Sequence, residues 1–304
     1  MLPSVESWLS ASWDDYRRRF WPLMAVLAVG GLVTAFFVFL PLAPAGLAAF
    51  LGLGSPWLIW GAASAFALLA GLWFSTWAQA AAMLAAATDS GADKALREGW
   101  RLTPAFAWVL SLVLLAVCGG FAVLILPGMI LSVLLFFAPF YQLGGEEKGL
   151  GAVELSFARV RPQFGAVAGR LATLALLVWV PSFIPYVGWL LSPLWAPFGI
   201  VAAARLAADL RALAPEPARP SLGPAIAALS LVFVVTSFSI AYFAARGAAA
   251  MYAAYASGEM ALPAPDASTS QSLISLLRGQ GSDEDVQRSL TYVIALSSAA
   301  GKAP

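Results

Sequence analysis

Long apolar stretches dominate this chain, and short polar segments separate them. Five such stretches lie at residues 21–42, 57–87, 104–141, 164–206 and 224–243. A helix needs about 20 apolar residues to cross the hydrocarbon core of a bilayer, so each stretch is long enough to span a membrane. The pattern predicts an all-α, polytopic membrane helix bundle.

Two of the stretches are too long for one span, and each contains a helix-breaking signal. Leu126-Pro127-Gly128 interrupts the third stretch, and a segment from Pro181 through Pro185 to Gly188 interrupts the fourth. Proline removes a helix donor and glycine permits a turn. We therefore expect tight hairpins at 126–128 and 181–188, and about seven spans in total.

Lysine and arginine gather on one side of these expected spans. They precede the first span, separate the second from the third and the fourth from the fifth, and follow the sixth. The three hairpin tips, at about 43–56, 126–128 and 181–188, contain none. The positive-inside rule then places the N-terminus in the cytoplasm and the C-terminal segment on the outer side.

Proline spacing indicates an internal repeat. Pro127 and Pro139 are separated by the same number of residues as Pro185 and Pro197, and Ala-Pro-Phe at 138–140 recurs at 196–198. The expected unit is an amphipathic helix, a span, a turn and a return span, with hinges at Pro127, Gly128, Pro139, Pro185 and Pro197. The units would cover 1–88, 89–143 and 144–212, followed by a linker and seventh span at 213–246 and an outer tail at 247–304. Coincidence in a proline- and alanine-rich chain is the alternative.

The segments that link the hairpins have helical periodicity. One apolar stripe comprises Leu150, Val153, Phe157, Val160 and Phe164, and another comprises Leu2, Val5, Leu9, Trp13, Tyr16 and Phe20. Amphipathic helices of this kind lie in the headgroup layer of a membrane. Either ordinary anchoring or binding of anionic lipid head groups explains their basic residues. The candidate headgroup contacts are Arg17, Arg18, Arg19, Arg97, Arg101, Arg159 and Arg161.

Residues four apart on a helix also predict local ion pairs. The expected pairs are Asp14–Arg18, Asp15–Arg19, Asp93–Arg97, Lys94–Glu98 and Arg205–Asp209. Arg170, at the edge of a span, is expected to extend to the cytoplasmic face.

Composition strengthens the membrane assignment and removes most catalytic chemistry. Of 304 residues 61% are hydrophobic and 11% charged, against roughly 25% charged in soluble domains. A net charge of +1 argues against a nucleic-acid partner. The chain has no histidine and one cysteine, Cys118, which excludes histidine ligands, histidine bases and disulfides within the chain. We expect no cofactor.

Two groups of polar residues leave alternatives open. The acidic residues of the polar linkers are either solvated loop charges or a metal or acid–base site, and they are Asp89, Asp93, Glu146, Glu147 and Glu154. Polar residues within the spans are expected to make helix-packing contacts. A polar cavity lined by Thr34, Gln79, Ser132 and Ser192 would instead indicate a transport path.

The C-terminal tail contains one further helix signal. Ser282 followed by Asp283, Glu284 and Asp285 is typical of a helix start. So short a helix needs a surface on which to dock. That surface is either the hairpin tips of the same chain or another polypeptide bound through residues 266–304.

The region around the second hairpin resembles a known family. The residues are Ile125-Leu-Pro127-Gly128-Met-Ile-Leu, then Phe137-Ala-Pro-Phe140, Glu147-Lys-Gly149 and the segment from Ala152 to Phe157. They are similar to the membrane domains of the glycerophosphoryl diester phosphodiesterase membrane-domain type and to related six-span families of the bacterial inner membrane. The resemblance covers residues 5–210 and implies fold and location. It implies no catalysis, because those membrane domains are not the catalytic part of the phosphodiesterases.

Together these observations predict a non-enzymatic protein of the bacterial inner membrane. The first expectation is an accessory or scaffold subunit of a membrane or envelope complex that also contacts lipid. The alternative is a passive transporter or lipid-translocating protein with its path along the repeat axis. An enzyme would require the loop carboxylates, with Glu147 and Glu154 among them, to converge on a bound metal.

Overall fold

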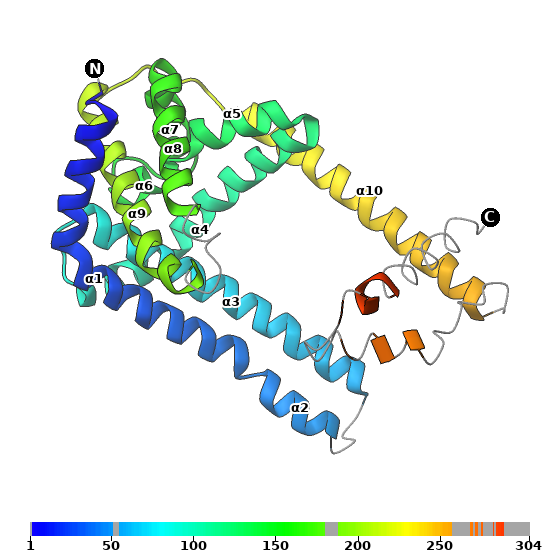
Figure 1. The fold of residues 1–304 in the computed structure, drawn as a ribbon. Coiled ribbons are helices and arrows are strands. Elements are labelled where there is room, and N and C mark those ends of the chain that lie inside the picture. Colours follow the sequence, from blue (N-terminus) through cyan, green and yellow to red (C-terminus); the bar gives the residue numbers. More distant parts are fainter. Residues whose placement is uncertain are drawn as a thin grey trace. The chain divides into compact units, whose positions relative to one another are not determined.

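The computed structural model of this chain is helical (Figure 1), and it describes residues 2–50, 55–179 and 188–256, with 268–269, 271–272, 275, 282 and 284–288 near the C-terminus. No strand occurs in these ranges, so the all-α expectation is confirmed for them. In chain order the elements are α1 (Val5–Phe39), α2 (Leu42–Phe50), α3 (Pro56–Ala87), α4 (Ala92–Val123), α5 (Ile125–Leu135), α6 (Ala138–Leu143), α7 (Leu150–Val160), the short 3-10 turn η1 (Arg161–Gln163), α8 (Phe164–Trp179), α9 (Gly188–Leu213) and α10 (Gly223–Ala256).

Five segments of the described chain are long and apolar enough to cross a membrane. They are Val5–Ala48, Leu58–Ala87, Ala92–Val123, Ile125–Leu143 and Gly223–Gly247. They coincide with the first four and the last of the expected spans, and the chain is therefore a multi-pass, membrane-embedded helical protein. The expected fifth and sixth spans correspond to α8 and α9, which are not among these five. The hairpin tip expected between them, Pro185 included, lies outside the described residues except for Gly188, where α9 begins.

The hairpin between α4 and α5 turns earlier than its proline predicts. Helix α4 ends at Val123, Leu124 alone is extended with φ −162° and ψ 156°, and α5 begins at Ile125. The break expected at 126–128 is therefore wrong. Pro127 lies in the first turn of α5, where a helix makes no use of the missing N–H.

Gly128 allows two helices to approach closely and does not form the turn. A Cβ atom at Gly128 would overlap the ring of Phe121, and a Cβ at Gly120 would lie 3.0 Å from the Gly128 Cα.

The other expected hinges differ from one another in their place within a helix. Pro139 lies in the first turn of α6, whereas Pro197 is buried inside the continuous helix α9 and interrupts nothing.

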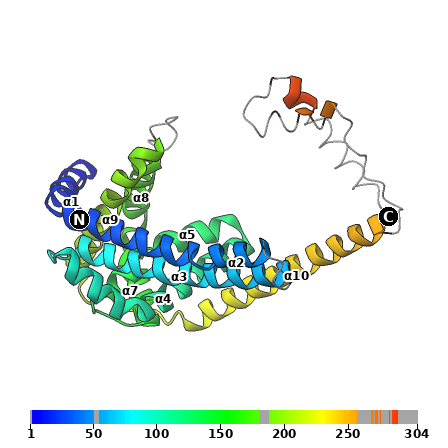
Figure 2. The ribbon, with the colours of Figure 1, turned by 90° about the horizontal axis from the view of Figure 1, so that it is seen from below.

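Helix α1 has two parts with different surroundings. It bends along its length (Figure 1) and contains Pro22, which removes a backbone hydrogen bond and explains the bend. Beyond the bend, α1 and α2 run beside α3 (Figures 1 and 2). Before it, the buried side chains are Trp8, Ser12, Asp15 and Tyr16. The expected apolar stripe is therefore only partly covered by protein, since Val5 and Trp13 are exposed, and the inward face also carries the Asp15 carboxylate.

The apolar core collects around α6, α7 and α9. Its largest fully buried side chains include Trp8, Phe106, Tyr141, Leu155 and Leu206. Seven of the eleven residues of α7 are buried, and this helix contacts α4, α5, α6 and α9. Helix α7 is therefore held by protein contacts, and its place in the headgroup layer stays an expectation. Its apolar stripe packs against protein on several sides.

The chain divides into two compact units, Met1–Phe233 and Val234–Pro304. Within the first unit the opening turns of α10 pack on α4, since Ile226 is buried and a Cβ at Gly119 would overlap the carbonyl of Leu229. Within the second unit Ser282 caps a helical turn at 284–288. The Asp285 N–H donates to Ser282 Oγ at 3.3 Å, and the Ser282 N–H donates to Asp285 Oδ2 at 2.9 Å. This reciprocal cap confirms the helix start expected there.

Candidate functional site

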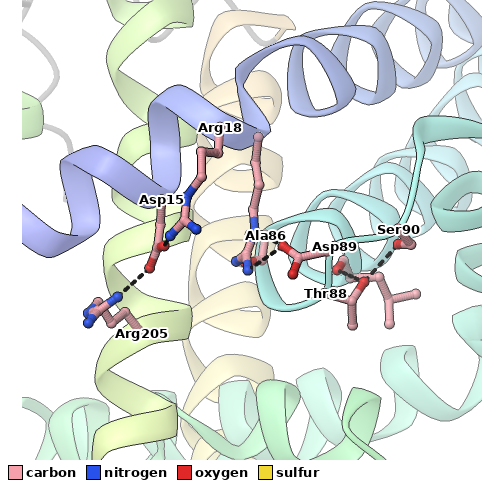
Figure 3. A network of polar contacts seen from close by, with 9 residues as sticks. Asp15, Arg18, Ala86, Thr88, Asp89, Ser90 and Arg205 are labelled. Atoms are coloured by element: carbon pink, nitrogen blue, oxygen red, sulfur yellow. Dashed lines mark hydrogen bonds and ion pairs between the residues drawn. The ribbon is translucent and has the colours of Figure 1, made fainter.

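Charged residues from distant parts of the chain meet in a first group, which we call the Asp15 cluster (Figure 3). Arg205 of α9 donates from Nη1 to Asp15 Oδ2 at 2.5 Å, and Arg18 donates to the other carboxylate oxygen. The Asp15 side chain is only 11% exposed. The expected pairing of Asp15 with Arg19 and of Arg205 with Asp209 is wrong, because the tertiary fold places Asp15 and Arg205 side by side.

Arg19, in the same cluster, joins α1 to the end of α3. Its Nε and Nη2 donate to Asp89 Oδ1 at 3.0 and 2.8 Å, and its Nη1 donates to the carbonyl of Ala86. Carbonyls in the last turn of a helix lack partners within the helix and carry the negative end of its dipole. A cation here therefore stabilises the end of α3, and Asp89, at the turn shown in Figure 3, is part of this contact.

A second group, the Glu146 cluster, lies where the loop after α6 meets the end of α9. Arg159 donates from Nη1 to Glu146 Oε2 at 2.7 Å, and Arg211 donates from Nε to Glu146 Oε1 at 2.8 Å. Arg159 also donates to the carbonyls of Ala214 and Pro215, and its guanidinium carbon lies 4.6 Å from the ring centre of Tyr141. Only 2% of the Arg159 side chain is exposed.

Glu147 of this loop and Glu154 of α7 also face partners from the linker after α9. Arg219 donates to Glu147 Oε1 at 2.5 Å, and the Leu222 N–H donates to Glu154 Oε1 at 2.9 Å. Gly145 and Gly149 adopt positive φ, which closes the turn that carries both glutamates. Glu146 and Glu147 are therefore ion-paired and not simply solvated. Within the described residues no group of three acidic, histidine or cysteine side chains could hold a metal ion.

The expected headgroup contacts fall into two sets. Arg17, Arg18, Arg97, Arg101 and Arg161 are exposed, and Arg97 pairs with Asp93 at 3.1 Å as expected. Lys94 and Glu98 also form the expected pair, at 3.9 Å. Arg19 is half-buried in the Asp15 cluster, and Arg159 is buried. The expected contact between Arg159 and a lipid head group is therefore wrong, because the donors of Arg159 are already used inside the protein.

Arg170 makes a tertiary contact that the sequence pattern does not predict. It is buried, and it donates to the carbonyls of Ala166 at 2.8 Å and of Pro3 near the start of α1. It therefore ties α8 to the N-terminal segment, and its donors are directed to backbone carbonyls instead of solvent. No signal in the local pattern distinguishes this arginine from one that extends out of a span.

A small cavity of about 250 Å³ lies beside the Asp15 cluster, lined by Asp15, Arg19, Ala86, Ala87, Ala204, Arg205, Ala208 and Asp209. Asp209 has one carboxylate oxygen, Oδ2, that is buried without a partner among the described residues. Burial raises the pKa of Asp209 above its ordinary 3.8, and Arg205 and Arg170 only partly oppose this rise. The folded protein therefore holds this proton more tightly than the unfolded chain does.

Asp209→Asn should stabilise the protein at pH 7, and this gain should shrink as pH falls toward 3.8. The raised pKa means that Asp209 favours folding at low pH and that this contribution is lost as pH rises through the raised pKa. The measurement is the thermal unfolding midpoint of both proteins in detergent between pH 4 and 7. Asp14→Asn, at an exposed site, is the control. A difference between Asp209→Asn and the parent that is constant across this range would contradict the assignment.

An apolar groove of about 430 Å³ lies between α3, α5, α8 and α9, and its walls include Met83, Phe136, Leu174 and Ile200. Of the four polar residues that would mark a transport path, only Ser132 borders it. Ser132 donates to the carbonyl of Met129 and Thr34 to that of Gly30, each within its own helix. Gln79 is exposed, and the side chain of Ser192 lies outside the described residues. These four residues do not form a common polar lining among the described residues.

No protein-family model, curated protein or solved structure matches this chain. The resemblance to the membrane domains of the phosphodiesterase type therefore stays an expectation. What the geometry itself provides is a set of charges that mostly pair with one another and with backbone groups. The ion pairs and hydrogen bonds of the two clusters hold the linker helices against the ends of the spans.

Proposed function

We propose that this protein is a non-enzymatic membrane scaffold, an accessory subunit of a membrane or envelope complex in the bacterial inner membrane. The observation that carries the proposal is the pairing within the Asp15 and Glu146 clusters. Asp15, Glu146 and Glu147 each accept hydrogen bonds from arginines far away in the sequence. Carboxylates used in this way hold the helices together and are poorly placed for acid–base work.

The proposed topology has seven spans in three hairpin units and one further span. Each of α1, α4 and the α7–α8 pair combines a linker segment with a more apolar segment, and a return helix or helix pair follows. That recurrence supports the repeat. With the basic linkers inside, the N-terminus is cytoplasmic and the tail at 247–304 is outside.

The partner is proposed to bind through the outer tail. Its capped turn at Ser282 and Asp285 is too short to be stable alone. Native mass spectrometry of the full chain, released gently from its own membrane, should show a second polypeptide at fixed stoichiometry. Deletion of residues 266–304 should remove that polypeptide and leave the thermal unfolding midpoint of the first unit unchanged.

A deletion that leaves every co-purifying protein in place would contradict the tail as the binding element. The alternative is a passive lipid-translocating path, which would need a polar lining, and among the described residues the groove between α5, α8 and α9 has only Ser132 as a polar residue. Lipid scrambling by the purified protein in vesicles, above the rate in protein-free vesicles, would support that candidate over the scaffold.

A further inference from the structure

A further cavity of about 400 Å³ lies between the first half of α1 and helix α9, apart from the cavity beside the Asp15 cluster and from the apolar groove. Its walls are Trp13, Tyr16, Arg17, Phe20, Trp21 and Trp195. Five of these six side chains are aromatic and the sixth is an arginine. A cavity with this lining accepts a ligand that is apolar over most of its surface and negative at one point.

The aromatic walls support one another. The rings of Trp13 and Trp195 lie 6.1 Å apart between centres, those of Trp13 and Tyr16 lie 5.5 Å apart, and those of Tyr16 and Phe20 lie 5.6 Å apart. Ring pairs at these distances attract each other and restrict rotation. These four rings therefore hold one side of the cavity in place before any ligand enters it, whereas Trp21 is largely exposed.

Arg17 is the one cation in this lining, and it remains available. Within the described chain no carboxylate forms an ion pair with Arg17, whereas its neighbours Arg18 and Arg19 pair with Asp15 and Asp89. Asp14, three residues earlier on α1, is exposed and makes no ion pair with Arg17. An anion at this cavity would therefore find a guanidinium that no carboxylate of the described chain already neutralises.

We propose that this cavity holds the phosphate and glycerol region of one anionic phospholipid. The phosphate binds Arg17, and the glycerol and the start of an acyl chain lie against Trp13, Trp21 and Trp195. Tryptophan rings prefer the level of the lipid head groups, and arginine there attracts anionic lipid. Inorganic phosphate alone would gain nothing from five rings. The assignment rests on the membrane location used in the proposed function.

The test is a titration of the purified full chain in detergent, followed by native mass spectrometry. The probes are phosphatidylglycerol and phosphatidylcholine with identical acyl chains. We expect one phosphatidylglycerol to remain bound at concentrations where phosphatidylcholine does not. Arg17→Gln should weaken this binding about fivefold, and Arg17→Lys should restore most of it because the positive charge is kept.

Matched controls separate this site from general lipid contact. Arg161→Gln removes another exposed arginine outside the cavity, and Trp108→Ala removes another exposed tryptophan for comparison with Trp21→Ala. Trp21→Ala should weaken binding and both controls should not. Equal losses in Arg17→Gln and Arg161→Gln, or equal binding of the two lipids, would overturn the site. Displacement of the lipid by millimolar inorganic phosphate would also overturn it.

Failure of this test would leave the scaffold proposal intact, since that proposal is tested by the stoichiometric partner. Thermal unfolding midpoints of Arg17→Gln and Trp21→Ala should match that of the parent. Both side chains are exposed, so their loss leaves the core unchanged. A binding loss with an unchanged midpoint then reports on the cavity itself.

Discussion

Arg159→Met should lower the free energy of unfolding by about 1–3 kcal/mol. The change leaves the carbonyls of Ala214 and Pro215 without their donor and removes one of the two arginines that pair with Glu146. It also removes the cation beside the Tyr141 ring. Glu146 and Ala214 are half-buried, so water replaces the lost hydrogen bonds only in part. Chemical or thermal unfolding in detergent measures the effect.

Arg161→Met is the matched control, because Arg161 lies two positions later and is exposed. It should change the free energy of unfolding by less than about 0.5 kcal/mol. Adding Glu146→Gln to Arg159→Met should recover part of the loss, since the second change removes a carboxylate that has lost a partner. Similar stabilities for Arg159→Met and Arg161→Met would show that the Glu146 cluster does not hold the fold together.

Gly30→Leu should destabilise the protein by about 1–3 kcal/mol through overpacking between α1 and α3. A Cβ atom at Gly30 would lie 2.5 Å from the Cβ of Ala78, so even the first added carbon forces the helices apart. Gly31→Leu is a control at the adjacent position, where a Cβ would meet nothing within 4 Å. Both changes raise helix propensity equally. Their difference in unfolding midpoint therefore isolates the contact.

The order of the two midpoints decides the interpretation. Gly30→Leu should unfold at a lower temperature than the parent, and Gly31→Leu at the same temperature or slightly above it. Equal midpoints would mean that α1 does not pack on α3 as closely as the fold requires. A similar contact exists between α3 and α4, where a Cβ at Gly99 would lie 2.9 Å from the backbone Cα of Ala81.

The membrane-crossing helices were predictable because their signal is local. A run of about 20 apolar residues is driven into a bilayer by its own composition, whatever the rest of the chain does. Residues 57–87 illustrate this, since the expected span agrees with α3 (Pro56–Ala87) almost to the residue. The helix cap at Ser282 was readable for the same reason, because its partner Asp285 is three residues away.

Positions of turns were less predictable. Pro127 and Gly128 both carry turn-forming signals, yet each is also compatible with the first turns of a helix. In the structure Gly128 lies inside α5 and packs closely on Phe121, and a single sequence does not reveal such a contact. The chain therefore turns at Leu124, a residue with no turn preference of its own.

The helical, membrane-embedded character of the chain and the places of its charges along it follow from the amino-acid sequence alone. The direction in which those charges point follows from tertiary packing. Asp15 and Arg205 are 190 residues apart and form an ion pair, and Arg159 is buried while Arg161 is exposed. Transfer of an apolar segment into lipid depends on that segment alone. The pairing of two charges far apart in the sequence depends on helix packing, which is a property of the whole chain.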